Sequence, residues 1–346
     1  MNHFVILAGG SGQRLWPLST KKCPKHLITF IDNKSLLEQT IERINWGNQK
    51  NPDHKIWVLT NQEQLELVKN HIQHLQVQNL DITVEAEPVA RNTAPAILWM
   101  CEKIKKLDHD ATIIILPADH FIPEKDIFNK TVEQAITFAQ NNAKIVTLGV
   151  MPTMPATGYG YIQADTSVCQ NIFPVIKFHE KPDLVKANQY INQPNMFWNA
   201  GIFVGKVSTF LNEFKTHSTQ LFDNMQSYIT GKKTYDSLEN ISIDYAIMEK
   251  SSNIYLIPAI FEWHDVGNLA VFLSLKKRFA KSIEDIINID GYNNLSSTSK
   301  KVVVCIGVSD LCIVETDNII LVSKKDCTEN VKNALPKVKQ IYGMGL

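Results

Sequence analysis

The chain has 346 residues, of which 44% are hydrophobic and 20% charged, so it is long enough to bury one large core and a smaller one in an ordinary globular protein. Lys plus Arg and Asp plus Glu both number 35, and this balance excludes a global field for nucleic acid or an anionic membrane, so an anionic ligand needs a local pocket. The six cysteines form no C-x-x-C pair, no apolar run has the length of a membrane span, and the N-terminal residues lack the features of a signal peptide, so we expect a reduced, cytoplasmic protein.

Apolar runs of strand length alternate with segments of helical period through the first 150 residues. The expected strands are residues 4–8, 55–60, 81–86, 111–116 and 144–150, and the expected helices are residues 35–46, 62–75, 93–107 and 125–141. Ser35 and Glu38 predict a capping box at the first helix. The alternation predicts an α/β fold of three layers, in which ligands bind beyond the carboxyl ends of the strands.

The sequence changes character after residue 280. Residues 293–300 are polar and loop-like, and short β-rich runs follow them. These runs are residues 302–306, 311–314 and 319–322, and a closing helix is expected near residues 327–339. We therefore predict a catalytic α/β domain at residues 1–280 and a small β-rich domain at residues 281–346.

A glycine-rich segment, LAGGSGQRLWPLS at residues 7–19, directly follows the first strand. Glycines tolerate positive φ and let backbone N–H groups approach an anion, so this loop can wrap a triphosphate. It lacks the Gly-Lys-Ser/Thr of a P-loop and the G-x-G-x-x-G spacing of dinucleotide folds, and a tight strand-to-helix turn is the alternative interpretation. Arg14 and Lys25 place cations near the loop, as nucleotidyl transfer requires at the phosphates.

The segment LAGGSGxRLWPLS followed by Pro24-Lys25 resembles the signature of the mannose-1-phosphate guanylyltransferases, within the nucleotidyltransferases that make nucleoside diphosphate sugars. Seven further blocks resemble that family in order: Glu87-Pro88 with Arg91-Asn92-Thr93-Ala94-Pro95-Ala96, Pro117-Ala118-Asp119-His120, Ala156-Thr157-Gly158-Tyr159-Gly160-Tyr161-Ile162, Glu180-Lys181-Pro182, Trp198-Asn199-Ala200-Gly201-Ile202-Phe203, Ser242-Ile243-Asp244-Tyr245-Ala246-Ile247-Met248-Glu249 and Trp263-His264-Asp265-Val266-Gly267. The resemblance implies a Rossmann-like nucleotidyltransferase domain with a mixed, mainly parallel sheet, and a small C-terminal domain like a left-handed β-helix.

The resemblance also implies an activity: GTP and α-D-mannose 1-phosphate would give GDP-mannose and diphosphate with Mg²⁺ as cofactor. Two alternatives stay open, namely another pair of nucleoside triphosphate and hexose 1-phosphate, and a catalytically silent regulatory homologue that binds GDP-mannose. A nicotinamide oxidoreductase is disfavoured by the glycine spacing. No nucleic acid or membrane partner is expected, and the oligomeric state stays open, with a homodimer as one alternative.

The residues expected to carry the chemistry are two cations and two carboxylates. Arg14 and Lys25 are the predicted catalytic residues, and the resemblance assigns Asp119 and Asp265 to Mg²⁺. A carboxylate at the end of a buried strand loses solvation energy unless a cation pairs with it, and a hard metal ion suits that place. The alternative is two aspartates that cap loops, and we interpret His120 as structural.

The predicted nucleotide-binding residues are Leu7, Ala8, Gly9, Gly10, Ser11, Gly12, Glu87 and Asn92. Guanine presents two adjacent donors, N1–H and the N2 amino group, which one carboxylate can accept together. Glu87 is the carboxylate expected to do this, and the backbone carbonyls of residues 7–9 could share the task.

The predicted sugar-phosphate-binding residues are Gly158, Tyr159, Gly160, Glu180, Lys181 and Asn199. By resemblance, Glu180 accepts hydrogen bonds from sugar hydroxyls and Lys181 contacts the phosphate. Pro182 predicts an extended backbone at Lys181. The main chain at residues 157–160 is expected to approach the hexose where a Cβ would collide, and Asn199 offers a donor and an acceptor, with a loop cap as its alternative role.

Overall fold

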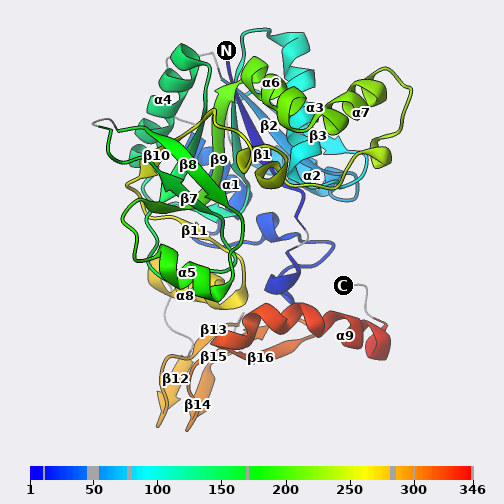
Figure 1. Cartoon of the computed structure of the whole chain (residues 1–346). Coiled ribbons are helices and arrows are strands. Elements are labelled where there is room, and N and C mark those ends of the chain that lie inside the picture. The colour runs from blue at the N-terminus through cyan, green and yellow to red at the C-terminus, as the bar shows by residue number, and fades with distance from the viewer. Residues whose placement is uncertain are drawn as a thin grey trace.

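The computed structural model of the chain describes residues 1–10, 12–44, 54–75, 80–168, 171–280, 286–298 and 301–343. Its main sheet has nine strands in the order β3-β2-β1-β4-β9-β6-β10-β8-β7 (Figure 1). These strands are β1 Asn2–Leu7, β2 His54–Asn61, β3 Ile82–Glu87, β4 Thr112–Pro117, β6 Ile145–Val150, β7 Tyr161–Ala164, β8 Phe173–His179, β9 Met196–Lys206 and β10 Ile254–Ala259. Within this part of the chain β8 and β9 run against the other strands, so the expected mixed, mainly parallel sheet is confirmed.

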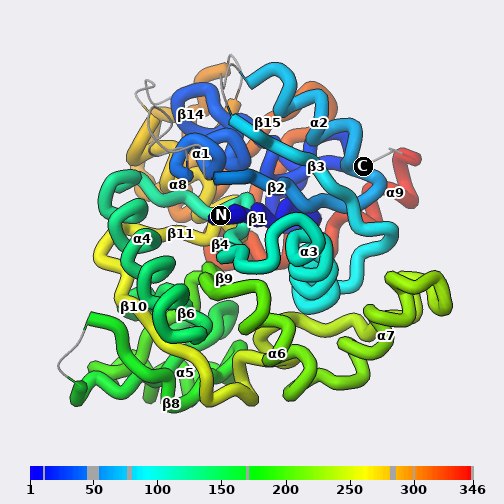
Figure 2. Tube along the Cα trace, turned by 90° about the horizontal axis from the view of Figure 1, so that it is seen from above, coloured from blue at the N-terminus to red at the C-terminus, as the bar shows by residue number. Residues whose placement is uncertain are grey.

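Helices cover both faces of the sheet, as the alternating sequence pattern predicted. The helices of the large part are α1 Leu36–Ile44, α2 Leu65–His74, α3 Thr93–Leu107, α4 Lys125–Asn142, α5 Leu184–Tyr190, α6 Val207–His217, α7 Thr219–Ile229 and α8 Leu269–Phe279. Seen from above, α3, α6 and α7 lie on one side of the sheet and α1 and α4 on the other (Figure 2). Residues 45 and 46, which the sequence added to the first helix, lie outside the described residues. Ser35 Oγ accepts the N–H of Glu38 at 3.0 Å, so the predicted helix cap is present.

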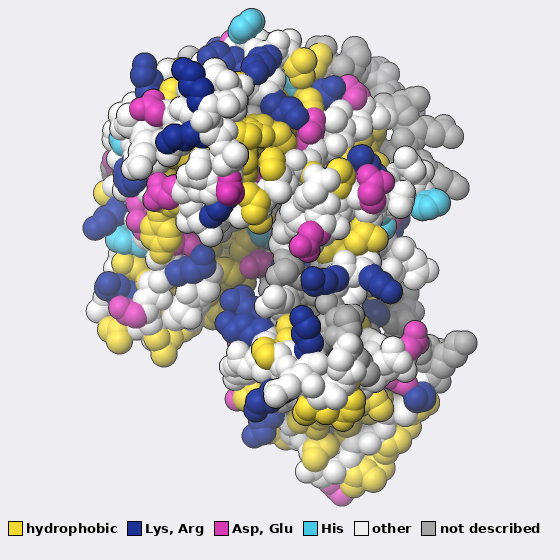
Figure 3. Space-filling view, turned by 90° about the vertical axis from the view of Figure 1, so that its right-hand side faces the viewer, with side chains coloured by type: hydrophobic (Ala, Val, Ile, Leu, Met, Phe, Trp, Pro, Cys, Tyr) yellow, Lys and Arg dark blue, Asp and Glu magenta, His cyan; other side chains and the backbone are white. Residues whose placement is uncertain are grey.

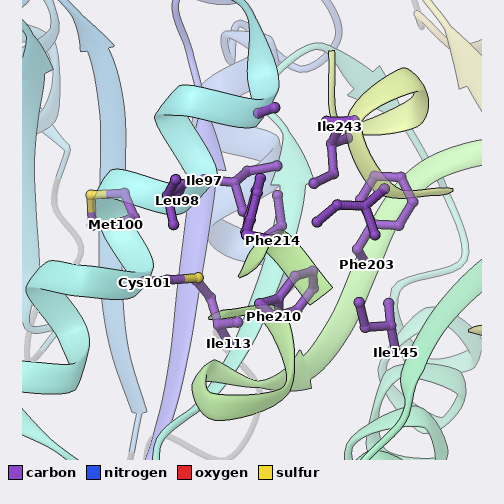
Figure 4. Packing of buried hydrophobic residues seen from close by; sticks show 14 of the residues in the cluster. Ile97, Leu98, Met100, Cys101, Ile113, Ile145, Phe203, Phe210, Phe214 and Ile243 are labelled. Atoms are coloured by element: carbon purple, nitrogen blue, oxygen red, sulfur yellow. The ribbon is translucent and has the colours of Figure 1, made fainter. Parts of the chain in front are cut away.

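The two faces of the sheet form separate cores because alternate side chains of a strand point to opposite sides. In β1, Val5 packs with α3 and α6, whereas Phe4 and Ile6 pack with α1 and α4. Figure 4 shows the first of these cores, where Ile97 of α3, Ile113 of β4 and Phe210 and Phe214 of α6 meet in the layer between helices and sheet. Strands buried on both faces explain the continuous apolar runs in the sequence.

The carboxyl ends of β1, β2, β3 and β4 form one edge of the sheet. The register pairs Leu7 with Leu59 and Pro117, and Asn61 with Glu87, so the segments that follow these strands emerge together. A short ladder between β5 (His120–Phe121) and β11 (His264–Asp265) pairs Asp265 with His120. This ladder joins the segment after β4 to a segment far along the chain.

The C-terminal part is β-rich, with parallel pairings between β12 and β14 and between β13 and β15, and an antiparallel pairing of β15 with β16. Its strands are β12 Ile286–Ile289, β13 Leu295–Ser297, β14 Val303–Ile306, β15 Leu311–Glu315 and β16 Ile320–Lys324. The expected closing helix is a 3₁₀ helix, Lys325–Asn333, followed by α9, Leu335–Tyr342. Since residues 281–285 lie outside the described residues, the boundary at residues 280 and 281 stays a proposal.

The expectation of a loop at residues 293–300 was wrong at residues 295–297, which form β13, while residues 299 and 300 lie outside the described residues. Asn294 is fully buried, donates to Val308 O at 2.9 Å and accepts from the N–H of Leu311 at 2.9 Å. Leu295 is buried beside it. Because the Asn294 side chain supplies hydrogen-bond partners for two backbone groups, this polar segment can form a short strand.

A third core joins the C-terminal part to the signature segment. It contains Leu15 and Trp16, Leu269 and Phe272 of α8, and Val331 of the 3₁₀ helix Lys325–Asn333. In Figure 1 the N-terminal segment, in blue, lies between the main sheet and the red C-terminal helices, and Figure 3 shows Lys and Arg side chains gathered along the waist between the two parts. No helix within the described ranges is long and apolar enough to cross a membrane.

Candidate active site

Two carboxylates and a lysine meet beside the signature loop. Lys25 Nζ lies 2.7 Å from Asp119 Oδ2 and 3.3 Å from Asp265 Oδ1. Asp119 follows β4, and the ladder between β5 and β11 brings Asp265 opposite His120. The structure therefore brings together the two predicted metal-binding residues and one of the two predicted catalytic cations.

The charges of this group support one another. Burial by itself lowers the pKa of the Lys25 ammonium, but the charges of Asp119 and Asp265 outweigh it and the pKa is raised. Burial likewise acts to raise the pKa of Asp119, and the Lys25 charge reverses the effect and holds that pKa well below its usual range. Two carboxylates around one ammonium leave an excess of negative charge, which suits a hard divalent cation.

His120 lies in the same group but has no lone pair for a metal. The ligand atoms of Asp119, His120 and Asp265 all lie within 4.8 Å of one another, and no further cluster of three such residues occurs in the described ranges. Trp263 Nε1 donates to His120 Nδ1 at 3.1 Å, so the neutral ring carries its proton on Nε2. Burial lowers the pKa of His120 and favours this neutral form. Of this group, Asp119 and Asp265 keep free carboxylate oxygens, so they are the candidate ligands for a metal ion.

Gly12 explains why the signature needs glycine at its third glycine position. Its φ is 62°, and a Cβ there would lie 2.4 Å from Lys25 Cβ, so a larger residue would displace the lysine. Ser19 Oγ donates to Gly12 O at 2.7 Å. At Gly9 and Gly10 no heavy atom lies within 4 Å of an added Cβ, so this side of the loop is open.

The start of the loop is held by the neighbouring strands. The carbonyls of Leu7, Ala8 and Gly9 accept hydrogen bonds from Ala118 N (3.1 Å), Thr60 Oγ1 (2.9 Å) and Asn61 Nδ2 (3.2 Å), respectively. Each carbonyl keeps one lone pair, so these bonds fix the loop without excluding a ligand. Ser11, also predicted to bind the nucleotide, lies outside the described residues.

Arg14, the second predicted catalytic cation, forms an ion pair with a residue of the C-terminal part of the chain. Its Nε lies 2.9 Å from Glu329 Oε2, and both side chains are about half exposed. Glu329 belongs to the C-terminal 3₁₀ helix and was not predicted as a site residue. A single glutamate in a polar helix carries no sequence signal, and only the tertiary structure brings it to the loop.

Glu87 and Asn92 lie at the end of β3 and the start of α3. Glu87 is buried, and its Oε1 accepts a hydrogen bond from the Tyr235 hydroxyl at 2.7 Å. Burial raises the pKa of Glu87 to about 7, against the lowering effect of that hydrogen bond. Asn92 caps α3 by accepting the N–H of Thr93 at 2.8 Å. A base can use Oε1 of Glu87 only by sharing it with Tyr235.

Glu87→Gln is expected to stabilise the protein above pH 7. A pKa raised from 4.5 to about 7 means that the folded state binds this proton more tightly, so the contribution of Glu87 to stability is complete below about pH 4.5 and is lost as the pH rises to about 7. The shift corresponds to roughly 3 kcal/mol, and glutamine has no such loss. Urea unfolding at pH 5 and pH 8 measures the difference.

The control for this prediction is Glu85→Gln on the same strand. Glu85 is only partly buried and pairs with Lys103 at 2.8 Å. We expect its replacement to leave the pH dependence of unfolding close to that of the wild type. An equal pH dependence in the wild type and Glu87→Gln would contradict the assignment of a raised pKa to Glu87.

Glu180 packs directly against the loop at residues 157–160. A Cβ on Gly160 would lie 2.7 Å from Glu180 Oε2, and Asn199 N donates to Gly160 O at 2.8 Å. Lys181 forms an ion pair with Glu180. The expectation of an extended backbone at Lys181 was wrong, since its φ is 44°. The turn after β8 overrides the preference imposed by the following proline, and such strained positions concentrate at functional sites.

Asp244 joins this group and was missed as a site residue. Asn199 Nδ2 donates to Asp244 Oδ1 at 3.1 Å, while Asn199 Oδ1 accepts from the N–H of Gly201 at 2.9 Å and from the Thr147 hydroxyl at 3.3 Å. Asn199 thus has one N–H left and mainly positions Asp244. Burial, followed by the charge of Glu180, raises the pKa of Asp244 to about 6. A signal was available, because Asp244 lies in one of the blocks that carry the family resemblance.

A cluster of three aromatic side chains connects this group to Asp119 and Asp265. The ring of Tyr159 packs against Trp198 and Trp263, with centroids 5.2 and 5.3 Å apart, and Trp263 is the residue that donates to His120. At Gly158 an added Cβ would meet no heavy atom within 4 Å, so this side of the loop is open. The predicted sugar-phosphate residues and the predicted metal ligands therefore border the same aromatic cluster.

Two family models match consecutive parts of the chain. A model described as nucleotidyl transferase matches residues 3–282, and a model described as MannoseP isomerase/GMP-like β-helix domain matches residues 284–338. The second match agrees with the parallel β12–β14 and β13–β15 pairings of the C-terminal part.

Named relatives resemble the chain over nearly its whole length. Mannose-1-phosphate guanylyltransferase of Salmonella montevideo is 32% identical over 97% of this chain and 73% of its own, and alginate biosynthesis protein AlgA of Pseudomonas aeruginosa is 32% identical over 96% and 71%. A solved structure described as mannose-1-phosphate geranyltransferase from Thermus thermophilus has a TM-score of 0.84 at 26% identity, covering 98% of this chain and 99% of that one.

Proposed function

The chain belongs to the nucleotidyl transferase family, and from this membership we propose that it is a mannose-1-phosphate guanylyltransferase acting in the cytoplasm. The proposed reaction converts GTP and α-D-mannose 1-phosphate into GDP-mannose and diphosphate. The observation that carries the proposal is the convergence of Asp119, Asp265 and Lys25 beside Gly12, at the sheet edge where ligands of this fold bind.

The chemistry is a single in-line displacement. An oxygen of the sugar phosphate attacks the α-phosphorus of GTP, the new P–O bond forms, and the bond to the bridging oxygen of the β-phosphate breaks to release diphosphate. Since the attacking oxygen is already anionic, the protein supplies no general base. Its contribution is alignment of the two substrates and neutralisation of their charge.

The Lys25 group, which consists of Lys25, Asp119 and Asp265, shares this task with Arg14. Asp119 and Asp265 would hold Mg²⁺, which supplies positive charge to the phosphate oxygens when bound. When the carboxylates bind the metal ion, they would no longer depend on Lys25 for a cation, and its ammonium would contact the phosphates. Arg14 would present its guanidinium to the charge that develops on the α- and β-phosphates.

The second group receives the sugar phosphate. Glu180 and Asp244 provide acceptors for sugar hydroxyls, and the exposed Lys181 provides a cation for the phosphate. The raised pKa of Asp244 also lets its carboxyl donate a hydrogen bond below about pH 6. For the base, Glu87 with Tyr235 remains the proposed contact.

Gly160→Ala is expected to raise KM for the sugar phosphate about tenfold and to leave KM for the nucleotide nearly unchanged. The new Cβ would lie 2.7 Å from Glu180 Oε2 and would push this carboxylate out of place, at a loss of about one hydrogen bond to a charged group. Steady-state kinetics with each substrate varied in turn measure both constants. In a Glu180→Ala background the displaced carboxylate is absent, so Gly160→Ala should raise the same KM little further. A full further rise in that background would contradict displacement of Glu180.

A substrate panel tests the proposed function. GTP, ATP, UTP, CTP and dTTP are each combined with mannose, glucose and galactose 1-phosphates, and diphosphate release is followed with Mg²⁺ and with EDTA. We expect the highest kcat/KM for GTP with mannose 1-phosphate and no turnover in EDTA. A higher kcat/KM for another pair would replace the proposed substrates, and tight binding of GDP-mannose without any turnover would indicate a regulatory homologue.

A further inference from the structure

The carboxylate of Glu329 is held at two points on the edge of the site. Oε2 forms an ion pair with Arg14, whose Nε lies 2.9 Å away, and Oε1 accepts a hydrogen bond from Asn268 Nδ2 at 2.9 Å. Asn268 is itself fixed, because its Oδ1 caps α8 by accepting the N–H of Val271 at 3.0 Å. Asn268 lies three residues beyond Asp265, so Glu329 connects the signature loop to the segment that carries a predicted metal ligand.

The 3₁₀ helix that carries Glu329 is anchored by apolar packing. Val331, two residues further on, is buried in the same core as Leu15 and Trp16, which follow Arg14, and as Leu269 of α8. Glu329 therefore lies on a helix that packs in the same core as the segments carrying its two partners, Arg14 and Asn268. Interdigitated side chains of this kind restrict movement between the elements they join.

The contact uses only part of the guanidinium. Arginine has five N–H donors, and the Glu329 oxygen of this ion pair lies beside Nε, which leaves the four N–H groups of the Nη atoms for phosphate oxygens. An exposed ion pair adds little to folding stability. We therefore expect this ion pair to affect mainly the orientation of the Arg14 guanidinium.

We propose that Glu329 is a positioning residue for catalysis: the C-terminal domain holds Arg14 through Nε so that its remaining donors face the phosphates. The inference rests on the proposed function, because it assigns Arg14 to the reacting phosphates. The β-rich domain then contributes to the active site, because the orientation of a catalytic cation depends on a residue from that domain.

A double-mutant cycle tests the proposal in the full-length protein. Arg14→Ala should lower kcat about 100-fold and change KM much less. Glu329→Ala should lower kcat about tenfold, because a small misplacement of a positioned group has effects of this size, and it should cause no further loss in the Arg14→Ala background. Asp326→Ala, which removes an exposed carboxylate from the same 3₁₀ helix, is the control and should leave kcat unchanged. Equal losses from Glu329→Ala with and without Arg14 would overturn the proposal.

A second measurement does not depend on turnover. The chain contains four arginines, Arg14, Arg43, Arg91 and Arg278, so ¹⁵N-arginine labelling gives four Nε–H signals at most, and Arg14→Ala identifies the one of interest. This signal should shift, and its proton should exchange faster, in Glu329→Ala but not in Asp326→Ala. An unchanged Arg14 signal in Glu329→Ala overturns the positioning contact. If the signal behaves as expected while the wild type turns over no substrate pair, the proposed function fails and the proposed catalytic role of Glu329 fails with it, whereas the contact itself stands.

Discussion

Replacing Asp119 or Asp265 by asparagine is expected to lower kcat about 1,000-fold. Each replacement keeps the shape of the side chain but removes one of the two carboxylates that converge on Lys25. A bound divalent cation contributes several kcal/mol of transition-state stabilisation, and each 1.4 kcal/mol corresponds to about a factor of ten in rate. The measurement is kcat at saturating substrates over a series of Mg²⁺ concentrations, where the variants should also require more metal.

Asp110→Asn is the matched control for these two variants. Asp110 precedes β4, at the opposite end of the strand from Asp119, and its exposed side chain pairs with Lys206 at 3.3 Å. This replacement removes the same charge next to the same strand without touching the site, so kcat should stay within about twofold of the wild type. Near-normal turnover of Asp265→Asn at low Mg²⁺ would rule out Asp265 as a metal ligand.

Lys25→Met is expected to make folding stability depend on Mg²⁺. Without the ammonium, two carboxylates that are only 30% and 33% exposed face each other without a cation. Removing one partner of a buried charged group costs about 3–5 kcal/mol, and partial exposure of the carboxylates places the expected loss in EDTA at about 3 kcal/mol. Binding of Mg²⁺ at about 100 times its Kd should restore most of this, since a ligand of the folded state stabilises it by about 2.7 kcal/mol at that concentration.

The same variant separates two roles of Lys25. Mg²⁺ should restore stability but not activity, and kcat should stay about 100-fold low because no ammonium reaches the phosphates. Lys206→Met, which removes the partner of the exposed Asp110, should show little loss of stability and no dependence on Mg²⁺. A Lys25→Met protein as stable in EDTA as the wild type would show that the two aspartates do not depend on this lysine.

Much of the site was predictable because its residues follow strands directly. Parallel strands bring their carboxyl ends to one edge, so a glycine loop after β1, Glu87 at the end of β3 and Asp119 after β4 had to lie along the same edge of the sheet. Family resemblance added Asp265, whose position depends on the two-residue ladder between β5 and β11. A ladder this short carries no periodic signal, and periodicity alone could not have placed it.

The errors arose where tertiary contacts outweigh local preference. The strand β13 forms in a polar segment because Asn294 satisfies the backbone at Val308 and Leu311, and Lys181 adopts a positive φ although a proline follows it. Rules based on neighbouring residues describe the average conformation of a residue type, and at these two positions the tertiary contacts impose a different one. Both lie where the chain turns sharply between strands or helices.

The amino-acid sequence by itself determined the α/β alternation, the glycine loop and the types of side chain available for binding phosphates and a cation. These features depend on steric and hydrogen-bonding preferences of neighbouring residues, which act over a few positions along the chain. Only the tertiary structure decided that Glu329 contacts Arg14, that Tyr235 bonds Glu87 and that Asn199 holds Asp244. Each of these pairs joins segments that are distant in sequence, and their meeting depends on how the packed cores set the distances between elements.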